Sequence, residues 1–230
     1  TNLPEVFAQI GEDMKELRNI SNPQNELLLF TGQSNMQRTM PYTWDVPSNL
    51  YVFDNVHNDP DSIGTGFEQP VGNRMSVPFS VAAERARTNP NKKIYVLVCA
   101  IGGQPIASWL PGGPNDIFGA ISNNLPLALS EAGLSRVSRI FWWQGESGGF
   151  QDTYGEDFEK VANRFETLSG IDDATPWTIF GVTPTSRGGE DRYDITNLWL
   201  QKIVQSKPAQ RKFVPTYALS SNAFWDDNVH

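Results

Sequence analysis

The chain has 230 residues and a formal net charge of −8, with one cysteine and two histidines. This length fits one α/β domain whose core is large enough to be stable without disulfide or metal cross-links. A single cysteine excludes an intrachain disulfide, and with only two histidines a Cys/His zinc site is nearly excluded. The acidic balance argues against nucleic acid and anionic membranes as partners, and no apolar run reaches the ~18 residues of a membrane span.

The first segment, residues 4–19, is predicted to be a helix because its acidic residues lie early and its basic residues late. A 3-4-3 spacing typical of a heptad seam relates its apolar residues Phe7, Ile10, Met14 and Leu17. Such a helix packs either on its own domain or on other copies of the chain. We interpret residues 1–25 as this helix and a linker, and residues 26–230 as one domain. The start at Thr1 without Met is typical of a mature or excised segment.

Buried strands and helices alternate from residue 26 onward. Apolar runs predict strands at residues 27–31, 51–53, 94–100, 139–143, 177–182 and 213–219. Helices are predicted at residues 78–87, from an Asn124 cap with Pro126 in the first turn to Gly133, from a Thr153-x-x-Glu156 capping box to Gly170, and around residues 195–203. The alternation predicts an α/β fold with a mainly parallel sheet covered on both faces.

Ligands of such sheets bind beyond the carboxyl ends of the strands. Ser34 follows the first predicted strand, where a serine either faces an oxyanion site or only caps a helix. Gly102 and Gly103 follow the third strand, where paired glycines let the backbone approach a ligand or make a tight turn. Gln144 and Glu146 follow the fourth strand; the amide can donate to an oxyanion, and the carboxylate can orient neighbours or bind sugar hydroxyls.

Two copies of Asp-Asn-Val-His offer a general base. One copy contains Asp227 and His230 at the chain end, and the other contains Asp54 and His57 after the second strand. A carboxylate three residues before a histidine can hold the imidazole in the tautomer that a base needs. Spacing does not choose between the copies, and surface charge on a loop explains either of them equally well.

A competing nucleophile lies in Gly145-Glu146-Ser147-Gly148-Gly149, which fits the G-x-S-x-G elbow of α/β-hydrolases. The chain order of Ser147, a later aspartate and His230 also fits that class. Few residues follow Ser147 to complete such a fold, and no HGGG-type oxyanion segment precedes it.

The segments Gly32-Gln33-Ser34-Asn35-Met36, Gly102-Gly103 with Ser108-Trp109, Trp143-Gln144-Gly145-Glu146-Ser147 and Asp227-x-x-His230 stand in one order along the chain. Together they resemble the SGNH hydrolases, and within them the sialate O-acetylesterase-like and acetylxylan-esterase-like carbohydrate esterases. The resemblance implies a flavodoxin-like three-layer α/β/α fold with a mainly parallel sheet of about five strands. One departure is Gly148, which stands where the family usually has Asp and puts the local loop geometry in doubt.

The resemblance also implies a serine esterase without metal or cofactor. It places the nucleophile at Ser34 and the base at His230, with Asp227 behind it. Oxyanion donors would be the backbone N–H groups of Ser34 and Gly103 and the side-chain amide of Gln144. The substrate would be an O-acetylated carbohydrate, such as sialic acid, xylan or a bacterial surface polysaccharide. Substrate contacts are expected from Gln33, Glu146 and Trp109. Trp142, Trp143 and Phe150 could also stack on sugar rings, and the alternative for Trp142 and Trp143 is a position partly in the core.

Residues 6–18 resemble, more weakly, a helical stretch that precedes receptor-binding parts of phage tail fibres and tailspikes. This implies a trimer formed through the N-terminal helix and an extracellular, secreted or virion-associated protein.

A second function class is a non-catalytic carbohydrate-binding domain on the same fold. That class would be marked by a broken triad, whereas all three triad residue types are present here.

Overall fold

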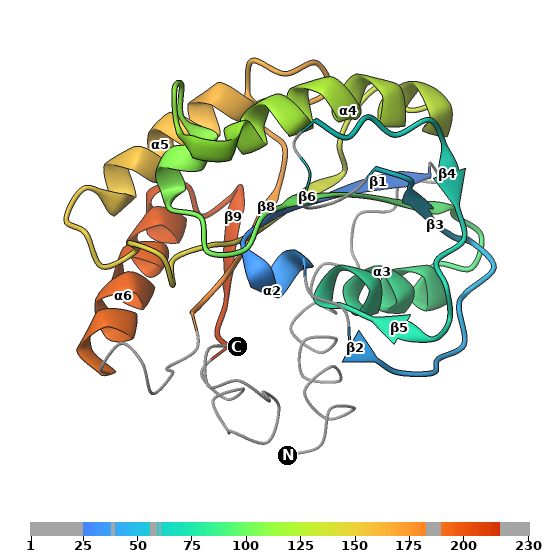
Figure 1. The fold of residues 1–230 in the computed structure, drawn as a ribbon, viewed down its shortest axis with the longest axis horizontal. Coiled ribbons are helices and arrows are strands. Elements are labelled where there is room, and N and C mark those ends of the chain that lie inside the picture. The colour runs from blue at the N-terminus through green and yellow to red at the C-terminus, as the bar shows by residue number, and fades with distance from the viewer. Residues whose placement is uncertain (1–24, 38–39, 56–58, 60, 183–189, 217–230) are drawn as a thin grey trace.

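The computed structural model describes residues 25–37, 40–55, 59, 61–182 and 190–216. Its centre is a seven-stranded sheet in the order β4-β3-β6-β1-β7-β8-β9 (Figure 1). The strands are β1 (Glu26–Gly32), β3 (Leu50–Phe53), β4 (Phe67–Glu68), β6 (Ile94–Ala100), β7 (Arg139–Trp143), β8 (Trp177–Phe180) and β9 (Arg211–Val214). Every neighbouring pair is parallel except β3 and β4. A separate antiparallel ladder joins β2 (Met40–Pro41) to β5 (Arg74–Met75).

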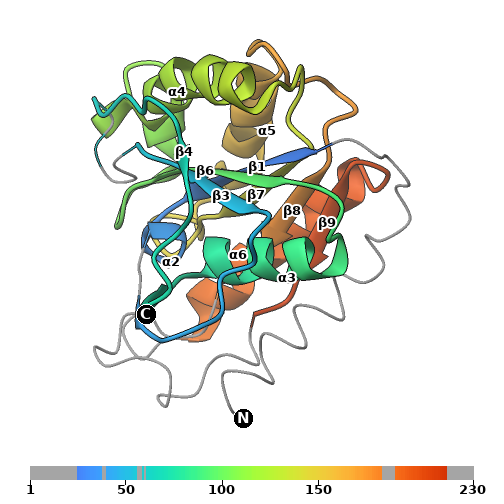
Figure 2. The ribbon, with the colours of Figure 1, turned by 90° about the vertical axis from the view of Figure 1, so that its right-hand side faces the viewer.

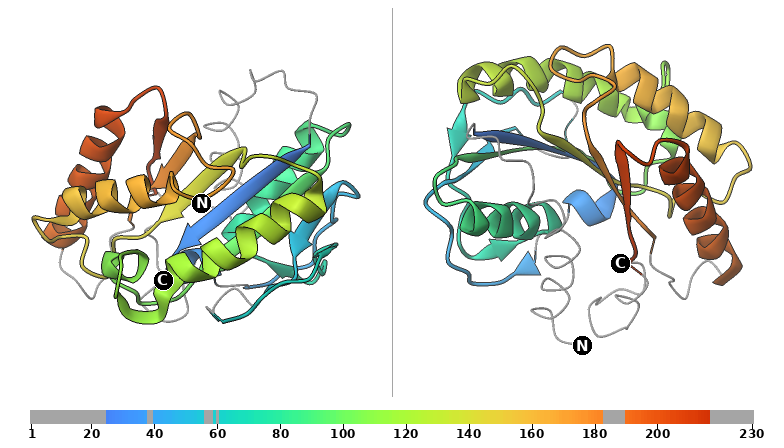
Figure 3. Two further views of the ribbon diagram at one scale, coloured as in Figure 1. Left: turned by 90° about the horizontal axis from the view of Figure 1, so that it is seen from above. Right: turned by 180° about the vertical axis from the view of Figure 1, so that it is seen from behind.

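Helices cover both faces of the sheet. They are α2 (Ser34–Gln37), α3 (Val77–Thr88), α4 (Ile117–Ala132), α5 (Tyr154–Phe165) and α6 (Glu190–Ser206), with 3-10 turns η2 (Ile106–Trp109) and η3 (Pro114–Asp116). One face carries α4 and α5, and the other carries α3 and α2 (Figure 2). Helix α6 packs against α5 and β9 at one end of the sheet, as the rear view in Figure 3 also shows. No described helix combines the length and the apolar composition that a bilayer crossing requires.

The three-layer α/β prediction is confirmed, with seven strands in the sheet instead of about five. The edge strand β4 has only two residues, too few for a periodic pattern to reveal. The predicted helix at residues 4–19 lies outside the described residues, so its role in assembly stays a prediction.

Strand β1 occupies the middle of the sheet, between β6 and β7. Its side chains alternate between two cores. Leu27 and Leu29 pack on the side of α4 and α5, and Leu28 and Phe30 pack on the side of α3. Burial of both faces explains why this strand reads as a continuous apolar run. The carboxyl end of β1 therefore lies at the middle of one sheet edge.

Helix α4 begins at Ile117, earlier than the predicted start at Asn124. The Asp116 side chain caps it by accepting the Gly119 N–H at 3.1 Å. Asn124 lies inside the helix, where its amide donates to the carbonyl oxygens of Ser62 and Ala120. The helix is therefore capped by Asp116 instead of Asn124, and Pro126 lies inside the helix.

The predicted capping box at Thr153 is also wrong. Helix α5 does begin at Tyr154, but Thr153 has helical backbone angles and its side chain makes no capping hydrogen bond. The strong apolar stripe that includes Phe158, Val161 and Phe165 is buried, so tertiary packing rather than the cap stabilises this helix.

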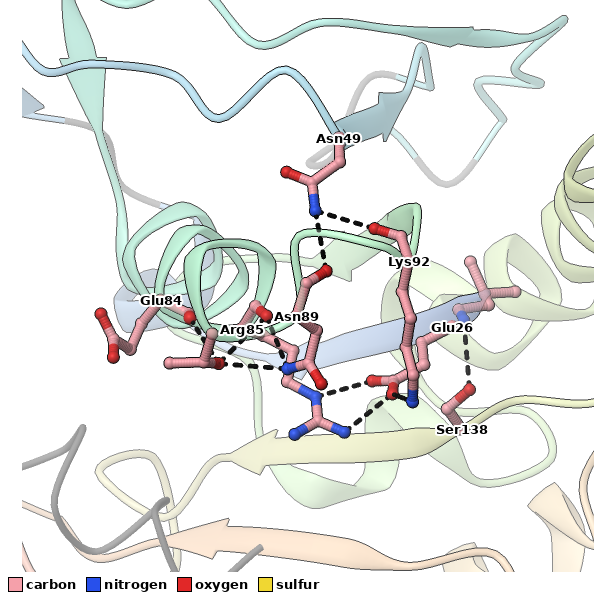
Figure 4. Close-up of polar contacts among 9 residues, drawn as sticks. Glu26, Asn49, Glu84, Arg85, Asn89, Lys92 and Ser138 are labelled. Carbon is pink, nitrogen blue, oxygen red and sulfur yellow. Dashed lines mark hydrogen bonds and ion pairs between the residues drawn. The ribbon is translucent and has the colours of Figure 1, made fainter. Parts of the chain in front are cut away.

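At the amino-terminal ends of the parallel strands, the Asn49 side chain connects the end of α3 to the turn that leads into β6 (Figure 4). Its amide donates to the carbonyl oxygens of Ala86, Asn89 and Lys92 at 3.0, 3.1 and 2.8 Å. Nearby, the Glu26 carboxylate accepts from Arg85 and Lys92. These contacts stabilise the amino-terminal ends of β1, β3 and β6.

Replacing Asn49 with Ala is expected to lower the free energy of unfolding by ~1–2 kcal/mol, because partly buried carbonyl groups lose their donor. Urea unfolding followed by circular dichroism measures the change. Asn73→Ala is the matched control, since Asn73 is exposed and only its backbone oxygen, which the substitution leaves in place, accepts the hydrogen bond from Tyr42 N–H. Equal stability losses in the two variants would contradict the assigned role of the Asn49 amide.

Candidate active site

Ser34 lies directly beyond the carboxyl end of β1, as the first residue of α2. The turn is tied to both neighbouring strands. Gln33 N–H donates to Trp143 O at 3.0 Å, and Ile101 N–H donates to Gly32 O at 3.2 Å. Gly32 has φ +149°, and a Cβ there would meet Trp143 O at 2.1 Å, so only glycine fits. Ser34 therefore stands at the sheet edge where the sequence predicts it.

The turn after β6 lies beside Ser34. Gly102 N–H donates to Gln37 Oε1 at 2.8 Å, and a Cβ on Gly102 would lie 3.4 Å from Ser34 Cβ. Gly103 has φ +71° and is exposed. Its N–H donates to no acceptor among the described residues. Two elements that are distant in sequence thus place a serine next to a glycine turn with an available backbone donor, as an oxyanion site requires.

Gln144 is fully buried at the end of β7. Its amide nitrogen donates to Gln104 O at 3.2 Å and to Ser147 O at 3.0 Å. Both amide hydrogens are engaged in these contacts, which join the loop after β6 to the loop after β7. To join an oxyanion hole, the amide would have to exchange one of these bonds for the oxyanion.

Glu146 holds the two residues that flank the candidate nucleophile. Its carboxylate accepts from Asn35 Nδ2 at 2.6 Å and from Gln33 Nε2. Burial raises the pKa of Glu146 to about 7, against the effect of these hydrogen bonds. Gln33 is only 2% exposed, so the structure presents its amide to Glu146 and not to a ligand, contrary to the predicted substrate contact. Glu146 orients its neighbours, one of its two predicted roles.

Trp109 was expected to stack on a sugar ring, and the structure places it in the core instead. The side chain is 0% exposed, and its indole N–H donates to Thr31 Oγ1 at 2.9 Å. Its ring packs against Trp142 with centroids 5.0 Å apart. Trp142 and Trp143 are also fully buried, which leaves Phe150 as the exposed member of the four aromatic residues.

The two Asp-Asn-Val-His copies differ in what the structure describes. Asp54 closes the loop after β3: one carboxylate oxygen accepts from the N–H groups of Thr65 and Gly66 at 2.6 and 3.0 Å, and the other accepts from Thr65 Oγ1 at 2.8 Å. The Gly66 N–H and the Thr65 groups lower the pKa of Asp54. This carboxylate is therefore used for loop closure. Outside the described residues lie His57, Asp227 and His230.

The segment around Ser147 does not form a strand-to-helix elbow. Turns follow β7, Gly149 N–H donates to Gly145 O at 2.9 Å, and α5 begins only at Tyr154. An elbow serine sits on a sharp turn directly before its helix. The α/β-hydrolase alternative is therefore not supported by the local geometry.

Asn35 belongs to the motif of residues 32–36 but has no role assigned to it from the sequence, and no sequence pattern singles out Gln37, although both contact site residues. Asn35 pairs with Glu146, 111 positions away, and Gln37 pairs with Gly102, 65 positions away. The only available signal is their position within three residues of Ser34, which puts them on the same short helix.

Replacing Glu146 with Gln is expected to remove part of the pH dependence of stability. Because its folded-state pKa is about 7 against a usual 4.5, the folded chain retains a proton that the unfolded chain releases. The free energy of unfolding of the wild type therefore falls as the pH rises from 4.5 to about 7, by at most about 3 kcal/mol. Urea unfolding at pH 5 and pH 8 measures the fall. Glu156→Gln, at an exposed glutamate of α5, should keep the wild-type dependence; a similar loss in both variants would contradict the assignment.

Similar solved structures share this fold. A carbohydrate acetylesterase from Xanthomonas citri superposes with a TM-score of 0.59 at 17% identity, covering 84% of this chain and 50% of its own. A protein from Arabidopsis thaliana gives 0.64 at 17% identity, covering 90% and 91%. The aryl esterase of M. smegmatis gives 0.51 at 12% identity, covering 89% and 90%. The chain thus spans about half the length of the Xanthomonas enzyme.

A search of curated protein sequences finds no match. The family model "Carbohydrate esterase, sialic acid-specific acetylesterase" matches residues 24–175. This range includes β1 with Ser34, the Gly102–Gly103 turn and the Gln144–Ser147 loop. The chain belongs to the family of sialic acid-specific acetylesterase carbohydrate esterases.

Proposed function

We propose that the chain is a serine esterase that removes O-acetyl groups from a carbohydrate, with Ser34 as nucleophile. The observation that carries the proposal is the position of Ser34 beyond the central strand, beside a glycine turn whose Gly103 N–H has no acceptor among the described residues. A nucleophile and an oxyanion donor side by side are the minimum that acyl transfer needs.

In the proposed reaction, His230 accepts the Ser34 proton while Oγ attacks the acetyl carbonyl, and Asp227 orients the imidazole. The tetrahedral oxyanion is stabilised by the backbone N–H groups of Ser34 and Gly103, and by Gln144 if its amide exchanges a bond. The sugar hydroxyl leaves with the proton from His230. Water, activated by the same histidine, then hydrolyses the acetyl-enzyme. Every step uses side chains and backbone of this chain.

The proposed substrate is an O-acetylated glycan. Support comes from the family description and from the Xanthomonas neighbour, a carbohydrate acetylesterase of which the matched region covers 50%. Sialic acid, xylan and bacterial surface polysaccharides all carry suitable acetyl esters. Phe150 lies in the loop that contains Gln144 and Glu146, and its side chain is partly exposed.

The test is acetate release from a panel of O-acetylated glycans, with p-nitrophenyl acetate as a substrate that needs no sugar contacts. The proposal expects hydrolysis of both, with a higher kcat/KM on one glycan class. Hydrolysis of p-nitrophenyl acetate alone would remove the carbohydrate part of the proposal. Glycan binding without acetate release would instead favour a non-catalytic carbohydrate-binding domain.

A further inference from the structure

Gln37 lies three residues after Ser34 on α2, so the two side chains are on the same side of this short helix. The Gly102 peptide rests on both of them. A Cβ on Gly102 would lie 3.1 Å from Gln37 Oε1 and 3.4 Å from Ser34 Cβ. The hydrogen bond from Gly102 N–H to Gln37 Oε1, at 2.8 Å, thus joins the glycine turn to the helix that carries the nucleophile.

The three consecutive backbone N–H groups that follow β6 differ in their hydrogen-bond acceptors. Ile101 N–H donates to Gly32 O at 3.2 Å, and Gly102 N–H donates to Gln37. Gly103 N–H, the third, finds no acceptor in the part of the chain that the structure describes. The first two donors fix the turn to β1 and to α2, and the third remains available for a ligand.

Hydrogen bonds have to fix this turn, because glycine dihedrals are the least restrained of all residues. Gln37 holds the peptide plane before Gly102. The plane that contains Gly103 N–H is held at Gly102 O, which accepts from Gln104 Nε2 at 3.3 Å. A Cβ on Gly103 would meet no atom of the described residues within 4 Å, so side-chain packing does not restrain this glycine there. The contact with Gln37 is the shorter of the two restraints.

We propose that Gln37 is a positioning residue for the oxyanion site: its side-chain oxygen holds Gly102 N–H and, together with Gln104 at Gly102 O, restrains the turn that directs Gly103 N–H toward the acetyl carbonyl. The inference rests on the proposed esterase function. Gln37 itself touches no reacting atom. Its removal leaves Gly102 N–H without an acceptor and frees a two-glycine turn, so the oxyanion donor is no longer pre-organised.

The test compares Gln37→Met, which keeps the length of the side chain but loses the carbonyl acceptor, with Gln69→Met. Gln69 is exposed, and its amide donates to Ser48 O at 3.0 Å. Both variants are assayed on p-nitrophenyl acetate and on its thiono analogue, whose carbonyl oxygen is replaced by sulfur. Because sulfur is a weak hydrogen-bond acceptor, the rate ratio of the oxygen ester to the sulfur ester reports on the oxyanion donors.

Gln37→Met is expected to lower kcat on the oxygen ester by ~10-fold, less than the ~10²–10³ of a deleted donor, with KM within about twofold. The oxygen-to-sulfur ratio should fall to a similar extent. Hydrogen exchange of Gly102 N–H, followed by NMR, should accelerate, and Gln69→Met should change none of these quantities. Melting temperatures of all proteins are measured to confirm folding.

An unchanged kcat and unchanged Gly102 exchange in folded Gln37→Met would overturn the inference. An equal rate loss on both esters would also overturn it, because a general structural defect does not distinguish oxygen from sulfur. If the wild type hydrolyses no acetyl ester, the proposed function fails. The exchange measurement still decides in that case whether Gln37 holds the turn.

Discussion

Ser34→Ala is expected to abolish acetyl-ester hydrolysis, with a fall in kcat of ~10⁵–10⁶, because the reaction loses the atom that forms the acetyl-enzyme. Ser34 is the serine that stands beyond the central strand and beside the glycine turn. Rates on p-nitrophenyl acetate before and after the substitution measure the loss. Thermal unfolding should show that the variant remains folded, since Ser34 belongs to neither hydrophobic core.

Ser147→Ala is the matched control and should retain most of the activity. Ser147 lies in a turn, and its backbone oxygen, which the substitution leaves in place, accepts from Gln144. An inactive Ser147→Ala beside an active Ser34→Ala would reverse the assignment of the nucleophile. Loss of activity in both variants, with both folded, would point to a role of Ser147 in binding.

The central strands of this fold are predictable from the sequence because they are buried on both faces. The predicted bounds of β6 and β7 agree with the structure, since β6 is an unbroken apolar run and every residue of β7 after Arg139 is apolar. The start of α4 is less legible. Asn124 followed by Pro126 imitates a helix start, and only the tertiary contacts of Asn124 with Ser62 and Ala120 show that its amide has another use. Local pattern and three-dimensional context disagree there.

The site residues likewise divide into those that the sequence predicts and those that only the three-dimensional structure reveals. Motifs place Ser34 and the glycine turn at one sheet edge, because strand order along a parallel sheet brings the loops together. The predicted sugar contact of Trp109 requires an exposed ring. Trp109 is buried instead, and its indole N–H donates to Thr31, 78 positions away, a pairing that no spacing rule contains. The pairing of Asn35 with Glu146 is equally invisible in a single sequence.

The second large effect is expected for the base. His230→Ala should lower kcat by ~10⁴ or more, since the members of a triad act as a unit. Asp227→Ala should cost less, because an aspartate that orients the imidazole accepts no proton. His57→Ala should cost little. The reason is the neighbouring Asp54, whose carboxylate is occupied by Thr65 and Gly66 and so is not free to orient an imidazole.

A pH–rate profile identifies the base if one other group is accounted for. The rate should rise as an imidazole loses its proton, near the usual histidine pKa of ~6.5. Burial raises the pKa of Glu146 to about 7, so this carboxyl titrates in the same interval. The rising limb is therefore measured in Glu146→Gln as well, where a histidine base keeps it. The limb should persist in His57→Ala, while His230→Ala should lose both the limb and nearly all of the rate; the reverse pattern would move the base to the copy after β3.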